Sequence, residues 1–465
     1  MSLPTESSSH APSLSYLAAK LIDEARKAGA TYVDALAVND TGDSISVRNG
    51  AVESVEREDA QGMGLRAFVE TDRGLAFATA SSSDVSESGL KKLAEQVVLM
   101  ARISEPDPNA MPPVGANHPD ADELKEWNKK HPGGNPGWDI GQARDAALHC
   151  EDVARHYSDK ITNSEGAEAS FGHNRVAYAS CDGFAAEYGK SSASISVSVI
   201  AGSGEGMQRD YAWHRARHVN DLRSPELIAE EAASRAVSRL NAGSMHSGHS
   251  SIVFEPRTAT SLLGHLVGAI NGRSVLQQRS FLTDALGQTI FPDFVNIEDK
   301  HDHPEGLGNR LFDGEGTRCS AHSLIDRGVL TTFLTDRYTA KRLNMQETGS
   351  AMRGLTGDIG IGSSNLIWQP GSHSQKAMLK EIGNGLLVTE LIGFGVNPVT
   401  GDYSRGAGGF LIENGEISRP VQGITIAGNL KEMFANIELV GSDLSWFGST
   451  AVPSIAVSGM TIAGQ

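Results

Sequence analysis

The stretch SLLGHLVGAINGRS, which runs from Ser261 to Ser274, places one histidine in an apolar helix, where a hydrolase could keep a metal site. A zinc helix needs two histidines about one turn apart on one face, with a glutamate beside the first as general base. His265 is the only histidine of this stretch, and nothing at 268–270 could act as a second ligand. We therefore interpret His265 as a structural histidine and expect no metal site in this helix.

Three glycines of the same stretch lie four residues apart. Gly264, Gly268 and Gly272 would form a stripe without side chains along the helix. Glycine inside a helix costs about 0.5–1 kcal/mol relative to alanine, so the stripe indicates that another backbone comes close to it. Two interpretations stay open, namely tight packing against a sheet of this chain and a peptide or partner chain that lies along the helix.

Other residues that could do chemistry give weaker signals. His301 and His303 in KHDHPEG could bind a metal in a loop, but a polar surface loop is the better interpretation. The sequence contains no G-x-S-x-G nucleophile elbow and no G-x-x-x-x-G-K-[ST] phosphate loop. A hydrolase that uses an unrecognised serine or loop histidine is kept as a separate hypothesis.

Composition excludes several classes of protein. Hydrophobic residues make up 39% of the 465 residues, and no stretch approaches the roughly 18 consecutive apolar residues of a membrane span. The net charge of −17 opposes direct binding to nucleic acid, which is held by clustered lysine and arginine. Three cysteines without a C-x-x-C pair argue against a disulfide framework and fit a reducing cytoplasm. The expected location is therefore cytoplasmic, without a membrane partner.

The first third of the chain predicts helices packed on an antiparallel sheet. Apolar spacing predicts helices over Tyr16–Ala28 and Ser86–Ile103, and Asn49-Gly50 is a strong hairpin signal. We assign 1–104 to an N-terminal α+β domain, of which 1–15 is a flexible tail rich in serine and proline.

Two further segments follow. Residues 105–137 are rich in proline and glycine, and we expect a linker or an excursion there. Residues 138–245 are predicted as a middle α/β segment, with a helix over Ile140–Tyr157 and alternating strands such as SSASISVSVIA. A second helix is expected after Ser224, a candidate N-cap, with Pro225 in its first turn.

The last segment, 250–465, is predicted as a β-rich domain. An embedded helix is expected over 257–272, and hairpins are expected at Asp326–Gly328 and at Asn414-Gly415. The fold class expected for the whole chain is therefore α+β.

Long motifs of the C-terminal half resemble the TldD/PmbA family. They are FDGEGTRCSAHSLIDRGVLTTFLTDRYTAKRLN, GFGVNPVTGDYSRGAGGFLIENGEI and SRPVQGITIAGNLKEMFANIELVGSD, and the earlier KITNSEGAEASFG fits as well. The resemblance covers nearly the whole chain. The family has two branches, and the resemblance implies that this chain belongs to one of them. The TldD branch resembles a zinc peptidase. The PmbA branch, also called TldE, pairs with a TldD subunit.

The zinc motif of the TldD branch is a His-Glu-x-x-x-His helix with a later cysteine as third ligand. On the matching helix of this chain, Gly264 takes the place of the first histidine, His265 that of the glutamate and Ala269 that of the second histidine. The last cysteine is Cys319, and GSDLSWFGSTAVPS, where the active branch would have its cysteine, contains none. The resemblance therefore implies a PmbA/TldE chain without a metal site or cofactor of its own, which is non-catalytic alone, and zinc in the TldD-type partner.

The family implies a heterodimeric peptidase that acts in proteolysis and maturation of extended or unfolded peptides. A homodimer of this chain is an alternative assembly. A peptide could add a strand to an exposed sheet edge. The residues proposed to contact a peptide or partner are Gly264, Gly268, Asn397, Tyr403, Arg405 and Gly408.

Two alternatives stay open. The segment Gly393–Gly409, which contains the last four of these residues, is equally well explained as a glycine-rich loop that closes the sheet. The alternative function is a regulatory protein-binding factor of the "modulator of DNA gyrase" type, which would act without proteolysis.

Overall fold

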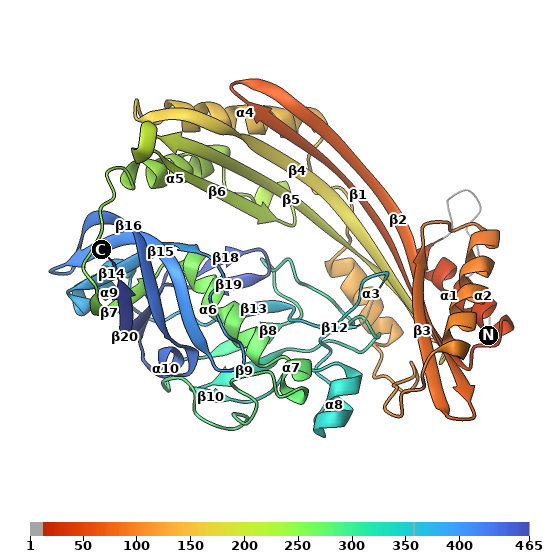
Figure 1. Cartoon of the computed structure of the whole chain (residues 1–465). Helices are drawn as coiled ribbons and strands as arrows, with labels where there is room; N and C mark the ends of the chain where they lie inside the picture. Colours follow the sequence, from red (N-terminus) through yellow and green to blue (C-terminus); the bar gives the residue numbers. More distant parts are fainter. Residues whose placement is uncertain (1–12, 357–358, 465) are drawn as a thin grey trace.

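A long curved antiparallel sheet arches over the C-terminal part of the molecule (Figure 1). The computed structural model describes residues 13–356 and 359–464. The sheet has six strands in the order β3-β2-β1-β4-β5-β6. The strands are β1 Tyr32–Arg48, β2 Ala51–Thr71, β3 Gly74–Ser82, β4 Ile161–Ser180, β5 Ala185–Ala201 and β6 Gln208–Ala216.

The segments 1–104 and 138–245 contribute three strands each to this one sheet. The junction is the pairing of β1 with β4, which runs from Asp34 opposite Ser180 to Val47 opposite Ala167. The two segments therefore share a continuous hydrogen-bonded ladder in the middle of the sheet.

The predicted hairpins are confirmed. Asn49 and Gly50 join β1 to β2 with φ of 54° and 76°, the left-handed conformation that a tight two-residue turn requires. The turn at Asn414 and Gly415 has φ of 53° and 81° and joins β15 (Asp402–Glu413) to β16 (Glu416–Asn429). The hairpin predicted at 326–328 is also present, between β9 (His322–Asp326) and β10 (Val329–Leu330).

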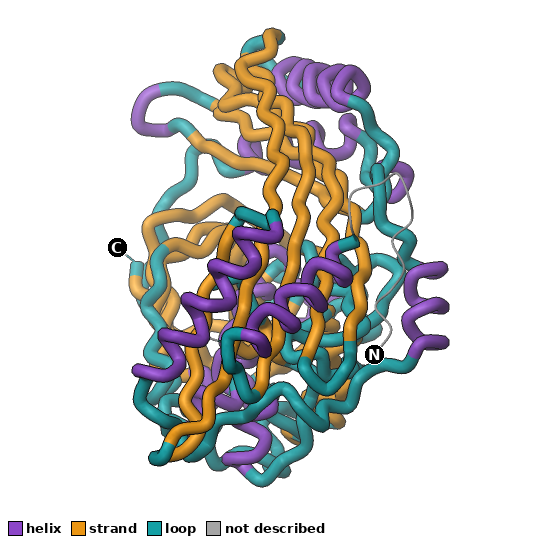
Figure 2. Tube along the Cα trace, turned by 90° about the vertical axis from the view of Figure 1, so that its right-hand side faces the viewer, coloured by secondary structure: helices purple, strands orange, loops and turns teal. Residues whose placement is uncertain are grey.

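Four helices cover one face of the sheet, and Figure 2 shows helices lying across the long strands on this side. They are α1 Leu14–Lys27, α2 Glu87–Ile103, α4 Ile140–His156 and α5 Pro225–Ser238. All four were predicted, and Ser224 caps α5 through its side chain as expected. The predicted end of the flexible tail 1–15 is wrong. Ser13 accepts a hydrogen bond from the Tyr16 amide and starts α1, whereas residues 1–12 lie outside the described residues.

The segment 105–137 contains a helix that the proline and glycine content did not predict. This helix, α3 (Ala121–Lys130), begins with a capping box in which Asp120 and Glu123 satisfy each other's backbone N–H groups. Its Trp127 is 6% exposed and packs edge-on against Tyr188 of β5, at a ring distance of 6.3 Å. The segment is therefore an excursion that packs back onto the uncovered face of the sheet.

The C-terminal part holds two further six-stranded sheets around one apolar core. In the first, pairing of β16 with β20 closes five strands into a ring, in the order β16-β15-β14-β7-β20. The strands not yet given are β7 Gly248–Phe254, β8 Ile297–Lys300, β11 Ala351–Met352, β12 Gly360–Ile361, β13 Asn365–Trp368, β14 Gly385–Ile392, β17 Ile437–Val440, β18 Ser445–Phe447, β19 Thr450–Val452 and β20 Ile455–Ala463. The remaining helices are α6 Pro256–Ala269, α7 Gly272–Leu276, α8 Arg337–Leu343, α9 Gln375–Ile382 and α10 Leu430–Ala435. The α+β fold class is confirmed.

The embedded helix predicted over 257–272 is two helices. α6 ends at Ala269, and Asn271 accepts hydrogen bonds from the Arg273 and Ser274 amides to start α7. The Gly272 amide donates to the Leu334 carbonyl oxygen at 2.8 Å, so this residue is drawn away from the axis of α6. A helical pattern in the sequence does not show such a break, because the competing acceptor is far away in the chain.

Candidate functional site

The glycine stripe of α6 is open where it was expected to be packed. An ideal Cβ placed on Gly264 or on Gly268 would meet no heavy atom within 4 Å, and both residues are exposed. Gly272 differs, because a Cβ there would lie 2.8 Å from the Leu334 carbonyl oxygen. Tight packing against a sheet of this chain is therefore the wrong interpretation for the first two glycines. The third is tightly packed, but against residues 334–335 and Thr339 of α8.

The opposite face of α6 is buried in the C-terminal core. Pro256 begins the helix, and its apolar residues pack between the two sheets. Buried on this face are Leu262, Leu263, Leu266 and Ala269. The helix also contacts β18 and β19, the hairpin within the stretch GSDLSWFGSTAVPS. The fold thus brings the three degenerate motif positions close to the place where the active branch would have its cysteine.

Three polar side chains meet beside the open glycines without being satisfied. The rings of His265 and Tyr403 lie edge to face with centroids 6.0 Å apart, and Tyr403 is 2% exposed. Within the described residues, the buried Nε2 of His265, the hydroxyl of Tyr403 and Nε of Arg405 make no hydrogen bond of good geometry. A buried polar atom without a partner costs roughly 1–3 kcal/mol, so this cluster is a polar defect in the core beside α6.

The electrostatics of the cluster keep its histidine neutral. Burial and the nearby Arg405 guanidinium both lower the pKa of His265. Burial raises the pKa of the Tyr403 phenol, so its hydroxyl stays protonated. A neutral imidazole and a phenol can each donate and accept hydrogen bonds, which suits a peptide backbone better than it suits an ion.

The other predicted contact residues have structural roles. Asn397 forms a turn, in which its side chain accepts from the Val399 amide at 3.0 Å and its own amide donates to the Asp402 carbonyl oxygen at 2.9 Å. Gly408 is buried at an irregularity of the strand pairing, where a Cβ would lie 3.2 Å from the Glu390 carboxylate. The structure therefore brings together Gly264, His265, Gly268, Tyr403 and Arg405, and leaves Asn397 and Gly408 outside the cluster.

The loop 301–305 holds parts of the chain together. Asp302 accepts from Lys130 and lies 3.0 Å from Nε2 of His131, both of which belong to the excursion. His303 packs against Trp446 with ring centroids 4.7 Å apart. Across residues 13–356 and 359–464, no three His, Cys, Asp or Glu side chains are grouped so that they could hold a metal ion.

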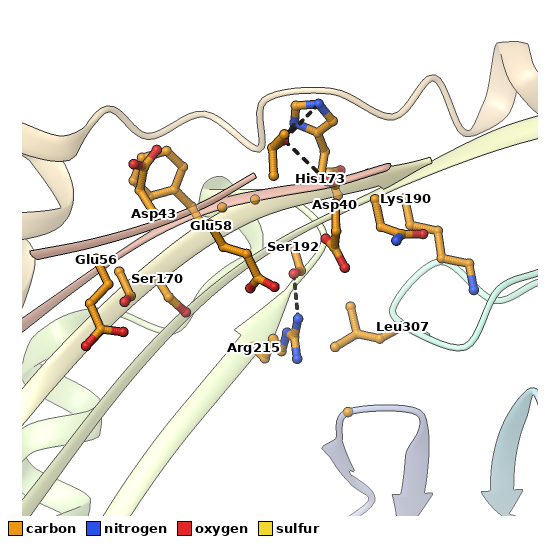
Figure 3. A pocket seen from close by; sticks show the side chains of 18 of the residues that line it. Asp40, Asp43, Glu56, Glu58, Ser170, His173, Lys190, Ser192, Arg215 and Leu307 are labelled. Atoms are coloured by element: carbon orange, nitrogen blue, oxygen red, sulfur yellow. Dashed lines mark hydrogen bonds between the residues drawn. The ribbon is translucent and has the colours of Figure 1, made fainter. Parts of the chain in front are cut away.

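A large cavity lies under the arch of the long sheet, on the face that the four helices leave uncovered (Figure 3). Its volume is about 920 Å³. Its floor is formed by β1, β2, β4, β5 and β6, and its other wall by Leu307, Gly308, Gly448 and Ser449. Since Gly448 and Ser449 join β18 to β19, the cavity extends to the hairpin that packs against α6.

The sequence and the fold were compared with those of known proteins. Profiles of the PmbA/TldA metallopeptidase domain 1, central domain and C-terminal domain match residues 33–101, 135–240 and 247–464. The Escherichia coli O157:H7 protein named Metalloprotease PmbA is 37% identical over 91% of this chain and 90% of its own length. The Haemophilus influenzae homologue is 33% identical over 96% of this chain and 94% of its own length.

The chain belongs to the PmbA (TldE) branch of the TldD/PmbA family. Two solved structures show the same fold. TldE from Thermococcus kodakarensis has a TM-score of 0.82 at 21% identity, with 96% of this chain and 99% of that chain covered. A candidate modulator of DNA gyrase from Bacteroides thetaiotaomicron has a TM-score of 0.83 at 24% identity, with 97% and 98% covered.

The zinc ion that the metallopeptidase family implies does not fit the residues of this chain. Gly264 has no side chain, and the methyl group of Ala269 is 3% exposed within the apolar core. The hairpin of β18 and β19 carries no thiol, so His265 would be the single donor, whereas zinc sites use three or four protein ligands. We derive no catalytic step through a metal bound to this chain.

Sequence reasoning missed the cavity under the sheet. Its signal was present in SSASISVSVIA, where serines alternate with aliphatic residues along β5. Such alternation predicts a strand with one polar face, but it does not show that five strands align their polar faces over one cavity. Separately, no helix in the described part of the chain has the length and apolar character needed to cross a membrane.

Proposed function

We propose that this chain is the zinc-free, PmbA/TldE-type subunit of a TldD/TldE metallopeptidase complex that cleaves and matures extended or unfolded peptides. The observation that carries the proposal is the open face of α6 at the position of the family's zinc motif, where Gly264 and Ala269 replace the donors. An exposed helix gains about 0.5–1 kcal/mol when alanine replaces glycine. Open glycines at 264 and 268 therefore make physical sense if a second chain approaches them.

A further feature beside this face supports a protein partner. Ile392 at the end of β14 is 58% exposed, and Phe394 in the loop that joins β14 to β15 is 97% exposed. A bridge between Val396 and Tyr403 places this loop against the strand that carries the cluster. Exposed apolar groups of this size are typical of an interface. The TldD-type subunit is the proposed occupant, since it would supply the zinc that this chain does not hold.

In this proposal the chain binds and orients the peptide. Hydroxyl groups on the cavity floor can donate to and accept from a peptide backbone without demanding a particular side chain. Such binding suits unfolded substrates of varied sequence. The chemistry of hydrolysis would come from the partner's metal, which polarises a carbonyl and activates water when bound.

The alternative is a regulatory protein-binding factor of the "modulator of DNA gyrase" type. The net charge of −17 opposes contact with the DNA backbone, so such a function would also act through a protein partner. The two candidates differ in whether the assembled complex cleaves peptides.

A reconstitution experiment separates them. The full chain, the TldD-type subunit of the same organism and their mixture are each incubated with an unfolded protein substrate, with and without chelator. We expect a complex on gel filtration, no cleavage by this chain alone, and cleavage by the mixture that the chelator abolishes. A complex without cleavage would favour the regulatory alternative. Cleavage by this chain alone that resists the chelator would instead show a hydrolase site of its own.

A further inference from the structure

The uncovered face of the long sheet has a floor of small polar residues. Along β5, Ser192, Ser194 and Ser196 alternate with Ile195 and Val197, which lie under α4 and α5. Because side chains alternate between the two faces of a strand, these serines point toward the cavity. The floor can therefore form hydrogen bonds with a ligand and leaves room for its backbone.

The strand register aligns this floor into rows that cross the sheet. One row runs from Glu56 on β2 through Ser44, Ser170 and Ser194 to Arg215 on β6. A parallel row runs from Glu58 through Gly42 and Gly172 to Ser192. Each row thus starts at a carboxylate and continues over small residues.

Opposite charges stand at the two ends of the first row, with Glu56 on β2 and Arg215 on β6, and Glu58 starts the second row (Figure 3). A third row holds Asp40 on β1 and Lys190 on β5, which are both in register with Asn174 of β4 and so lie two strand spacings apart. Within the described residues, none of these five charged side chains forms an ion pair. Arg215 donates to the Ser192 hydroxyl at 2.8 Å, and Lys190 lies 5.7 Å from the centroid of the Tyr188 ring.

Two ion pairs elsewhere join strands of the same sheet: Arg175 of β4 binds Glu187 of β5, and Arg209 of β6 binds Glu165 of β4. In the first row, by contrast, Glu56 and Arg215 are held apart across a floor of serine. Such an arrangement complements a ligand that carries a positive group at one end and a negative group at the other.

The separation of the charged ends sets the length of that ligand. From β2 to β6 there are four strand spacings, or about 19 Å measured along the sheet. An extended chain advances about 3.3–3.6 Å per residue, so five or six residues span this distance. A peptide of this length with free ends carries an ammonium and a carboxylate at the required separation.

We propose that the cavity binds a short extended peptide by both of its ends, with the α-amino group against Glu56 and Glu58 and the C-terminal carboxylate against Arg215. The proposal rests on the peptide-handling function proposed above and specifies its ligand: peptides of five or six residues with free termini. The peptide then lies across the strands, over the serine floor.

The test measures binding of uncharged Gly/Ala/Ser peptides to the full chain by isothermal titration calorimetry. Hexapeptides are compared with free ends, with an acetylated amino end, with an amidated carboxyl end and with both ends blocked. Blocking either end should weaken binding by up to about fivefold, since an exposed ion pair contributes about 0.2–1 kcal/mol and 1.4 kcal/mol is tenfold in affinity. Peptides of three and of twelve residues should bind more weakly than the hexapeptide.

Variants assign each end to its residues. The double variant Glu56→Gln and Glu58→Gln should lose the preference for a free amino end and keep the preference for a free carboxyl end. Arg215→Gln should do the reverse. Asp59→Asn is the matched control, because Asp59 follows Glu58 on β2 and its side chain points to the other face. An acetylated hexapeptide with one lysine side chain separates an α-amino group from a side-chain amine as the positive group.

Equal affinity for free and doubly blocked hexapeptides, no binding of any peptide, or end preferences unchanged in the cavity variants would overturn the inference. Chelator-sensitive cleavage by the reconstituted complex, combined with equal affinity for free and blocked peptides, would leave the proposed function standing and overturn only this inference. End preferences in the isolated chain would support it whether or not a partner is found.

Discussion

Gly268→Leu is expected to weaken assembly with the TldD-type subunit by about tenfold or more while the isolated chain melts at or above the parent temperature. No atom of this chain lies within 4 Å of a Cβ at this position, so the new side chain finds room. Leucine also favours a helix over glycine by roughly 0.8–1 kcal/mol. In the complex, however, the side chain must displace what lies on α6, and overpacking costs about 1–3 kcal/mol, where 1.4 kcal/mol is tenfold in affinity.

Gly272→Leu is the matched control for this prediction. A Cβ at Gly272 would approach the Leu334 carbonyl oxygen to 2.8 Å and the Thr339 hydroxyl to 2.9 Å. We therefore expect this variant to lower the melting temperature of the isolated chain. Gly264→Leu should behave like Gly268→Leu. The measurements are melting temperatures of the isolated variants and titration calorimetry with the partner. Unchanged melting together with unchanged affinity for both α6 variants would show that the open glycine face is not part of the interface.

Asp34→Ala is expected to lower the free energy of unfolding by about 3–5 kcal/mol, because it leaves the buried Arg353 without its ion-pair partner and leaves Arg66 with Glu315 alone. Asp34 is fully buried on β1, with its oxygens 2.5 Å from Nη2 of Arg66 and 2.6 Å from Nη1 of Arg353. The Tyr178 hydroxyl donates to the same carboxylate at 3.2 Å. Since Arg353 belongs to the C-terminal part, this pair also joins the arch to the rest of the molecule.

The pH dependence of this contact has a definite sign. Burial alone would raise the pKa of Asp34, but Arg353 and Arg66 outweigh it and hold that pKa below its usual range. The stabilisation is therefore present above the pKa of an unfolded aspartate, about 3.9, and is lost as the pH falls through the lower folded value. Urea unfolding at pH 7 and in acid measures the effect. Asp59→Ala on the exposed side of β2 is the control and should change stability by less than about 0.5 kcal/mol. A loss below about 1 kcal/mol for Asp34→Ala would contradict this account of the buried pair.

Local features of the fold could be predicted from the sequence. Caps such as Ser224 and turns such as Asn49-Gly50 act through neighbouring backbone atoms, so a short window of residues contains the whole interaction. The helix α3 was also within reach, since ADELKEWNKK contains neither proline nor glycine and follows an aspartate cap. The proline and glycine content of the surrounding segment 105–137 conceals the helical pattern of these ten residues.

Features that depend on distant partners could not be predicted. Pairing of β1 with β4 joins residues more than a hundred positions apart, and it is this pairing that creates the arch and the cavity. The spacing of Gly264 and Gly268 indicated a missing neighbour but could not show whether that neighbour belongs to the same chain. Likewise, the alternation in β5 predicts that one face of this strand is polar. It does not predict that carboxylates of β2 lie on the same face of the sheet.

The most direct test of the central claim is the zinc content of the purified full chain, determined by mass spectrometry of metals after purification without chelator. Because Gly264 and Ala269 offer no donor and His265 would be a single ligand, the account predicts zinc far below one ion per chain. It also predicts about one zinc ion per complex when the TldD-type subunit is bound. About one zinc ion per isolated chain, lost in His265→Ala, would contradict the claim that this subunit carries no metal site of its own.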